Sequence, residues 1–451
     1  MPSSFLNDML QTLTDRSRAL LGLSKGAVAG GDLAKLATQL LSRRGEASGV
    51  LLAATILAAY RAAPEASRRA FLTTLAETFG PDEARLKAAV EAYQADPTPE
   101  TIAALGIAAE SRRQELFRRL NLAPGGTASL VRMRADLQDF SKDDPSLRAI
   151  EPDFVHLFSS WFNRGFLVLR PIDWTTPANI LEKIIRYEAV HEIRDWKDLR
   201  NRLEPTDRRC FAFFHPQLAD EPLIFVEVAL TAGIPDAIAP LLAEDRVPIE
   251  AKVATTAVFY SISNTQKGLA GITFGNFLIK QVVEDLKREV PNLKTFVTLS
   301  PVPGFARWLQ AERQAAEPRF LSPALMDELA PLDGAEWPHD AAVRDTLRAP
   351  LLAAAAAYFL KAKGSSGRPM DPVARFHLGN GARLERLNAF GDLSAKGIAQ
   401  SFGLMVNYLY ALDDIEQNHE AYAEKGVVAA ARSVQRHLRN DVPARDAVLP
   451  A

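Results

Sequence analysis

Ser300 is the first of three candidates for a functional site, because its residue type and its sequence neighbours suit a catalytic role. It follows the apolar segment Thr295–Leu299 and directly precedes Pro301, which restricts it to an extended conformation. We therefore expect Ser300 at the carboxyl end of a strand, on the same face as Phe296 and Thr298. This is where open α/β sheets bind their ligands. A serine that simply ends a strand before a turn is the structural alternative.

His377 is the second such residue. It lies between Phe376 and Leu378 and is followed by the segment Gly379–Gly381, which reads Gly-Asn-Gly. An imidazole exchanges protons near neutral pH, and the glycines favour a tight backbone around a ligand. A hydrogen-bonded core histidine is the alternative. The other histidines have weaker contexts and no HExxH or comparable spacing occurs, so no metal site is expected.

A glycine-rich loop, QKGLAGITFG, is the third candidate, with Gly268, Gly271 and Gly275 close together. Glycines let the backbone approach a ligand, and the N–H groups that open the next helix favour an anion. The loop matches neither a Walker A sequence nor the dinucleotide fingerprint. The pattern Q-x-G-L-x-G-I-x-x-G-x-x-L-I resembles the pyrophosphate loop of GNAT-type acetyltransferases, which implies coenzyme A as ligand. A plain strand-to-helix turn is the alternative.

Ser300 and the loop belong to one predicted strand–loop–helix–strand unit, Val253–Trp308. β-branched and aromatic residues on both faces of the first strand indicate a buried strand, with one face formed by Thr256, Val258, Tyr260 and Ile262. A four-residue spacing of apolar side chains predicts the helix, through Leu278, Val282 and Leu286. The second strand is Thr295–Leu299, so Ser300 should lie beside the loop.

Residues 1–150 are predicted to form a helical bundle, because Ala, Leu, Arg and Glu dominate and glycines or prolines separate the segments. The expected helices are Phe5–Leu21, Asp32–Leu41, Gly49–Ala62, Glu65–Phe79, Asp82–Tyr93, Thr98–Leu120 and Thr127–Phe140. The region has no histidine and no candidate catalytic group. We expect it to serve packing or oligomerisation, and a fragment beginning near Glu151 to keep the chemistry.

Residues 151–451 are expected to form an α+β or α/β domain. Strands are predicted at Phe166–Arg170, Cys210–Phe214 and Leu223–Leu230, and helices at Ala178–Tyr187, Trp196–Leu203, Arg319–Lys361 and, as one polar surface helix, Glu420–Val442. Glu227 lies inside an apolar strand, where a carboxylate needs a partner or a raised pKa. A paired structural role and a functional role both remain open for it.

Composition excludes several classes of function. The chain has 451 residues and a net charge of −2, so it lacks the basic footprint of a nucleic-acid-binding protein. The longest apolar run, Ala349–Leu360, is too short to span a bilayer. Cys210 is the only cysteine, which excludes an internal disulfide and fits a reducing compartment. Neither end matches a signal peptide or a peroxisomal signal, so we expect a cytoplasmic location.

Four segments together resemble the malonyl-CoA decarboxylase family: FYSISNTQKGLAGITFGNFLIK, TFVTLSPVPGF, RFHLGNGA and SFGLMVNYLY. They occur in order through most of residues 150–425, and the LSPxPGF and FHLxNGA motifs are specific. The resemblance implies an α+β two-domain chain, with a helical N-terminal domain (1–150) and a GNAT-like α/β catalytic domain with helical insertions (151–451). It implies decarboxylation of malonyl-CoA to acetyl-CoA and CO2 without metal or prosthetic group, in a homo-oligomer, dimer or tetramer.

The resemblance also implies site residues. Ser300, in the LSP motif, and His377, in the FHL motif, correspond to catalytic residues, and Tyr410 corresponds to a tyrosine near the site. The family's substrate-binding loop corresponds to Ala270, Gly271, Ile272, Thr273, Phe274, Gly275 and Asn276. Thr273 stands where animal members have a glutamate, which argues against an acidic role there.

The residue types suit this chemistry. Loss of CO2 from a malonyl thioester leaves an enolate, which donors facing the thioester oxygen stabilise. We expect His377 to protonate the α-carbon and Ser300 to orient the carboxylate or the histidine, with no covalent acyl-serine. A CoA-dependent GNAT-type acyltransferase and a non-enzymatic acyl-CoA sensor are the alternatives. Turnover of malonyl-CoA alone separates the three.

Overall fold

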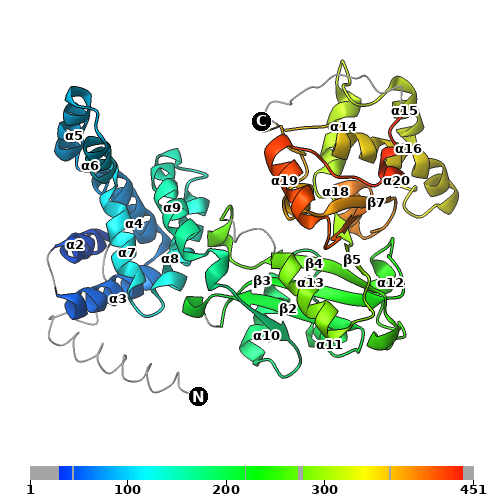
Figure 1. The fold of residues 1–451 in the computed structure, drawn as a ribbon, viewed down its shortest axis with the longest axis horizontal. Coiled ribbons are helices and arrows are strands. Elements are labelled where there is room, and N and C mark those ends of the chain that lie inside the picture. Colours follow the sequence, from blue (N-terminus) through cyan, green and yellow to red (C-terminus); the bar gives the residue numbers. More distant parts are fainter. Residues whose placement is uncertain (1–29, 43–44, 219, 273–277, 365–366, 440–451) are drawn as a thin grey trace. The chain divides into compact units, whose positions relative to one another are not determined.

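The computed structural model describes residues 30–42, 45–218, 220–272, 278–364 and 367–439, which divide into two compact units (Figure 1). The first unit draws on three stretches of the chain, Met1–Leu167, His215–Ala219 and Gln266–Phe274. The second unit contains the rest, including the whole β-sheet. The first unit is therefore discontinuous in sequence, and it includes the beginning of the glycine-rich loop.

The first unit is helical, as predicted. Its α-helices are α2 (Gly30–Leu41), α3 (Glu46–Ala62), α4 (Glu65–Thr78), α5 (Glu83–Ala95), α6 (Pro99–Ala109), α7 (Arg112–Asn121), α8 (Gly126–Phe140) and α9 (Glu151–Trp161). The predicted helix Phe5–Leu21 lies outside the described residues. The stretch predicted as helical from Thr98 to Leu120 forms two helices, because the first N–H groups of α7 donate to the carbonyls of Phe79 and Gly80 and turn the chain.

Buried charges and aromatic rings hold the core of this unit together. Phe117 and Phe154 stack with ring centroids 4.3 Å apart. The guanidinium of Arg113 donates to Asp153 at 2.7 Å and to the carbonyls of Leu75, Ala76 and Ala149. A buried arginine is stable only with such partners. By contrast, α5 and α6 form a hairpin in which α5 buries none of its residues.

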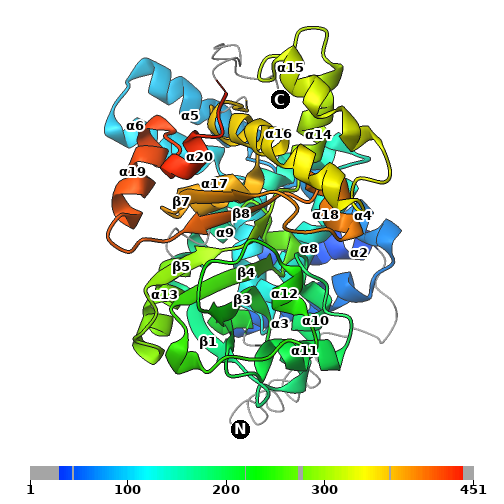
Figure 2. The ribbon, with the colours of Figure 1, turned by 90° about the vertical axis from the view of Figure 1, so that its right-hand side faces the viewer.

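The second unit is built on an eight-stranded sheet (Figures 1 and 2). Its strands are β1 (Val168–Ile172), β2 (Arg208–Phe214), β3 (Pro222–Thr231), β4 (Thr256–Asn264), β5 (Thr295–Thr298), β6 (Ser300–Pro301), β7 (Arg383–Asn388) and β8 (Met405–Leu409). The order is β1-β2-β3-β4-β5-β8-β6, and β7 pairs with β8. Among the described strands, β4 and β5 are the parallel neighbours, and the helix α13 (Leu278–Glu289) lies between them in sequence. The strand, the helix and the second strand of the predicted unit are thus present, and its loop is described up to Ile272.

A β-bulge in β4 changes the predicted face of that strand. Glu227 of β3 pairs with Ser261 and the next residue, Val228, pairs with Phe259, so Tyr260 is the extra residue. The expectation that Ile262 shares a face with Val258 is therefore wrong, because an extra residue reverses the alternation beyond it. The bulge instead brings Ile262 to the same face as Phe259.

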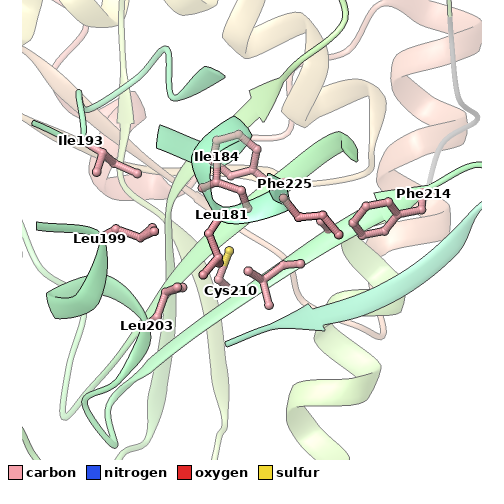
Figure 3. Packing of buried hydrophobic residues seen from close by; sticks show 11 residues of the cluster. Leu181, Ile184, Ile193, Leu199, Leu203, Cys210, Phe214 and Phe225 are labelled. Carbon is pink, nitrogen blue, oxygen red and sulfur yellow. The ribbon is translucent and has the colours of Figure 1, made fainter. Parts of the chain in front are cut away.

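Two helices cover the sheet near β2 and β3. α10 (Ala178–Tyr187) and α11 (Trp196–Leu203) have the predicted bounds, and they bury Leu181, Ile184, Leu199 and Leu203. These side chains pack with Cys210, Phe214 and Phe225 of the sheet (Figure 3). The lone cysteine is thus part of the hydrophobic core, and burial raises the pKa of its thiol.

A short helix, α12 (Ala239–Leu242), lies between β3 and β4 in sequence. The other helices follow β6: α14 (Phe305–Gln314), α15 (Pro323–Glu328), α16 (Ala341–Leu360), α17 (Pro372–Gly379), α18 (Ala395–Ser401), α19 (Ile415–Lys425) and α20 (Arg432–Gln435). α16 and α17 pack on β7 (Figure 2). The predicted single helix Glu420–Val442 is wrong. α19 ends at Gly426, whose φ of 62° lies in the left-handed region that terminates helices, and α20 is separate.

Candidate active site

The segment that carries Ser300 is held by strands on both sides. The Leu299 N–H donates to the carbonyl of Phe259, and Ser300 pairs with Val406 of β8. Ser300 is 6 % exposed and lies on the same face as Thr298, because its hydroxyl donates to the Thr298 Oγ1 at 2.9 Å. The predicted extended conformation and face are therefore confirmed.

His377 lies in the last turn of α17. The helix begins after Asp371, whose side chain accepts from the Ala374 N–H at 2.8 Å, and Pro372 is its first residue. Gly381, the last residue of the Gly-Asn-Gly behind His377, has a packing role, and a ligand contact of this segment stays a prediction. Gly381 has a φ of 79°, and a Cβ there would lie 2.1 Å from the carbonyl oxygen of Ile415 in α19.

A chain of hydrogen bonds joins the two predicted residues and Tyr410. His377 Nε2 lies 3.2 Å from Ser300 Oγ, and His377 Nδ1 lies 2.8 Å from the Tyr410 hydroxyl. Since the Ser300 proton is directed to Thr298, Ser300 Oγ accepts from Nε2–H. Nδ1 is then the acceptor, and Tyr410 donates to it. This order assigns one neutral tautomer, in which the Nε2 of His377 carries the proton.

The charge state of this histidine follows from its burial. His377 is 3 % exposed, and desolvation lowers its pKa to about 3. The end of a helix favours a cation, by about 0.3–1 kcal/mol on exposed surfaces. Loss of water outweighs that effect here, so His377 is neutral at pH 7 in the free protein. Burial likewise raises the pKa of Tyr410, so that side chain keeps its proton.

Three further residues, which sequence reasoning did not assign to the site, hold this chain in place. Thr298 Oγ1 accepts from the Tyr408 N–H at 3.1 Å as well as from Ser300. The Tyr408 ring stacks on the imidazole of His377 with centroids 4.6 Å apart. The Asn407 amide donates to the Thr298 carbonyl at 2.7 Å. The polar side chains embedded in the apolar run Ile398–Leu412 were the available signal.

Ser300 and His377 line a cavity of about 230 Å³ within the second unit. Most of its wall is apolar or aromatic, and its lining includes Val190, Phe259, Ile262, Val373 and Phe376. Asn264 adds one amide from the end of β4. A mostly apolar cavity with a few converging polar groups is the usual form of a small-molecule site.

A buried carboxylate fixes one part of this wall. Glu188 accepts from the N–H groups of Val190 and His191 at 2.8 and 2.7 Å, and from the hydroxyl of Ser261 at 2.7 Å. Ser261 lies just beyond the bulge of β4. The bulge thus gives one strand two roles, because Ser261 anchors the segment that carries Val190 while Phe259 and Ile262 line the cavity.

Glu227 belongs to a separate buried network. It is fully buried and its carboxylate lies 3.1 Å from Arg202, which also pairs with Asp198. Desolvation raises the pKa of Glu227 to about 8 despite the arginine. Of the two roles left open by the sequence, the paired one agrees with the structure.

The glycine-rich loop is described only up to Ile272. Ala270, Gly271 and Ile272 lie in the first unit, and Gly271 has a φ of 76° that favours glycine. Thr273, Phe274, Gly275 and Asn276 lie outside the described residues. The expectation that Ser300 lies beside this loop stays a prediction.

Two features of the described residues bear on the class of site. No group of three or more His, Cys, Asp or Glu side chains in these parts of the chain is placed to hold a metal ion. No helix in the same ranges is both long and apolar enough to cross a membrane.

Comparison with known proteins gives the family. Residues 165–448 match the family model of the malonyl-CoA decarboxylase C-terminal domain, and residues 79–162 match that of the N-terminal domain. The mitochondrial malonyl-CoA decarboxylase of Anser anser anser is 36 % identical over 410 residues, which cover 83 % of this chain and 81 % of that protein. The mouse enzyme is 33 % identical over 408 residues, covering 83 % and 82 %.

Solved structures agree with these matches. The crystal structure of malonyl-CoA decarboxylase from Rhodopseudomonas palustris has a TM-score of 0.88 and 64 % identity, covering 90 % of this chain and 99 % of that one. The structure from Agrobacterium vitis has a TM-score of 0.86 and 58 % identity, covering 91 % and 100 %. By sequence and by fold, the chain belongs to the malonyl-CoA decarboxylase family.

Proposed function

We propose that this protein is a carboxy-lyase that converts malonyl-CoA to acetyl-CoA and CO2 in the cavity lined by Ser300 and His377. The observation that carries the proposal is the chain from Tyr410 through His377 to Ser300, which ends at an apolar cavity in a member of this family. In the reaction the bond between the α-carbon and the carboxyl carbon breaks, and its electron pair moves into the thioester as an enolate. One proton then adds to the α-carbon. The thioester itself accepts the electrons, so the proposal needs no metal or prosthetic group.

The low pKa of His377 explains how the proton could be supplied. A substrate carboxylate placed against the imidazole favours the charged form, so His377 takes up a proton when the substrate binds. When CO2 leaves, that carboxylate no longer exists, and the enolate holds the negative charge. The imidazolium can then donate its proton, because the burial that lowers the pKa of His377 in the free protein disfavours its charged form. Proton transfer from Nε2 to the α-carbon restores the neutral histidine.

The same geometry favours a non-covalent role for Ser300. A serine nucleophile needs a base that accepts its proton. Here Nε2 carries a proton of its own, and the Ser300 hydroxyl donates to Thr298. Ser300 instead offers an oxygen that holds the Nε2–H and lies at the cavity wall. Tyr410 keeps the other ring nitrogen occupied, and its hydroxyl can rotate to accept when Nδ1 becomes protonated.

Coenzyme A is proposed to bind with its pyrophosphate at the loop Ala270–Asn276. The left-handed conformation of Gly271 supports this, because such a turn exposes backbone N–H groups that suit an anion. An apolar cavity also favours decarboxylation, since it removes water from the carboxylate that is to leave.

The protein is proposed to act as a homo-oligomer in the cytoplasm, with the helical region forming contacts between copies. The support is helix α6, whose sequence PETIAALGIAA is mostly apolar although it buries only Ala108. Ile102 and Ile107 of this helix are 56 % and 58 % exposed. Isolated exposed apolar residues are common, but a helix exposing most of its apolar residues suggests an interface. Sedimentation should show a smaller particle for Ile102→Glu than for the native chain.

One assay tests the function. Purified protein is incubated with malonyl-CoA alone, and CO2 and acetyl-CoA are quantified. Formation of both in equal amounts supports decarboxylation. Turnover of acetyl-CoA only when an amine acceptor is added would indicate an acyltransferase. Tight binding of malonyl-CoA without product would indicate a sensor.

A further inference from the structure

The described part of the glycine-rich loop is held by helix α8 of the first unit. The guanidinium of Arg134 donates from Nη1 to the carbonyl of Gly268 at 2.7 Å and from Nη2 to the carbonyl of Ala270 at 2.9 Å. Arg134 is 1 % exposed and also pairs with Glu151 at 2.5 Å. The loop carbonyls are therefore partners that this buried cation needs.

The fit between loop and helix is close. A Cβ at Gly268 would lie 1.8 Å from the carbonyl oxygen of Val131 in α8, so only glycine allows this approach. At the loop's outer edge Lys267 pairs with Asp139, also in α8. Helix α8 thus fixes the loop from residue 267 to residue 270 through contacts of three kinds.

The contact with Arg134 also sets the direction of a peptide group. The peptide bond between Ala270 and Gly271 is planar and trans, so its C=O and N–H point in opposite directions. Since Arg134 holds the Ala270 carbonyl, the Gly271 N–H is directed away from the guanidinium. This N–H belongs to the residue with the positive φ, near the start of the proposed pyrophosphate loop.

We infer that Arg134 is a positioning residue for coenzyme A, and that the helical N-terminal region helps bind the substrate by fixing this loop. The inference rests on the proposed function of the loop. It also argues against the expectation that a fragment beginning near Glu151 keeps the full chemistry, because that fragment lacks Arg134. Arg134 acts through the backbone of the loop, so it should affect binding of the nucleotide end of the substrate far more than the chemical step.

A merely structural arginine would behave differently, and the chain offers a matched control. Arg113 is also a buried arginine of the helical unit, 6 % exposed, paired with Asp153 and bonded to three carbonyls. These four partners all lie outside the loop. Arg113→Met should therefore lower stability as much as Arg134→Met does, without the same effect on coenzyme A.

The experiment compares both variants with the native chain by the kcat and KM for malonyl-CoA. It also compares inhibition by CoA and by pantetheine, which lacks the pyrophosphate. For Arg134→Met we expect the KM and the inhibition constant of CoA to rise about tenfold or more, the scale of a lost hydrogen bond to a charged group. The inhibition constant of pantetheine and the kcat should stay within about twofold. For Arg113→Met all four constants should stay near the native values.

A second variant covers the case in which Arg134→Met does not fold. Gly268→Ala leaves the guanidinium in place but forces the loop away from Val131, and it should give the same pattern. Equal rises for CoA and pantetheine, or unchanged constants in a folded Arg134→Met or Gly268→Ala protein, would overturn the inference. Failure of the proposed function is seen separately, because the native chain would then release no CO2 from malonyl-CoA.

Discussion

Binding of a terminal carboxylate in the cavity should make His377 take up a proton. The ligand for this test is S-(2-carboxyethyl)-CoA, which keeps the carboxylate at the spacing of malonyl-CoA but has no thioester carbonyl and does not decarboxylate. S-ethyl-CoA lacks the carboxylate and serves as the control ligand. Free His377 has a pKa of about 3, so it binds almost no proton at pH 5.

The size of the effect follows from the burial of the site. Opposite unit charges about 4 Å apart interact by about 4 kcal/mol at an effective dielectric constant of about 20. One pH unit corresponds to about 1.36 kcal/mol, so the carboxylate should raise the pKa of His377 by about three units. The bound state would then titrate near pH 6. Proton uptake should approach one per site at pH 5 and become small at pH 7.

Calorimetry in buffers of different ionisation enthalpy measures this uptake directly. The difference between the two ligands isolates the carboxylate, because changes at the CoA phosphates occur with both. We expect a difference of nearly one proton at pH 5 for the native chain and none for His377→Gln. Equal proton uptake for the two ligands at pH 5, with both bound, would refute the coupling between carboxylate and histidine. The proton for the α-carbon would then have another source.

Four further predictions concern the same residues. Ser300→Ala should lower kcat by about 10²–10³, the scale of one lost positioned donor, and rapid quench with intact-mass analysis of the native chain should reveal no acyl adduct. His377→Asn should fold and lose about 10²–10⁴ of the turnover, so a fully active variant would remove His377 from the mechanism. Thr298→Val should lower kcat while Thr298→Ser retains it, and ¹⁵N spectra should show whether the Nε2–H tautomer is lost with the hydroxyl. Below pH 6.5 the unfolded chain protonates His377 and the folded chain does not until about pH 3, so acid reduces stability. His377→Gln should therefore lose about 2 kcal/mol less unfolding free energy between pH 7 and 5 than the native chain.

The elements around the site could be predicted because their signals are local. Pro301 fixes the conformation of Ser300, and the four-residue spacing from Leu278 gives α13. Its apolar flanks and the Gly-Asn-Gly that follows singled out His377 among the histidines. His377 Nε2 lies 3.2 Å from the Oγ of Ser300, a residue 77 positions away. This proximity depends on the path of β8 and α17, which cannot be predicted from a local sequence pattern.

The errors arose where long-range contacts outweigh local preference. The position of the extra residue Tyr260 depends on how β4 pairs with β3, and this pairing depends on the whole sheet. Alternation within β4 alone therefore placed Ile262 on the wrong face. The close packing of Gly381 on the backbone of Ile415, in another helix, was likewise not visible from the Gly-Asn-Gly sequence alone. The role of Arg134 was missed for the same reason, because its carbonyl partners lie 134 and 136 residues along the chain.

That separation has a consequence for the order of folding during synthesis. A ribosome adds roughly 5–20 residues per second, so the carbonyls of Gly268 and Ala270 emerge roughly 7–27 s after Arg134. Until then the guanidinium has Glu151 as a partner but lacks two of the acceptors it has in the folded protein. Helix α8 thus leaves the ribosome well before the residues that complete its buried contacts. A nascent chain that stops near residue 162 should remain open at α8 and be a preferred target for chaperones and proteases.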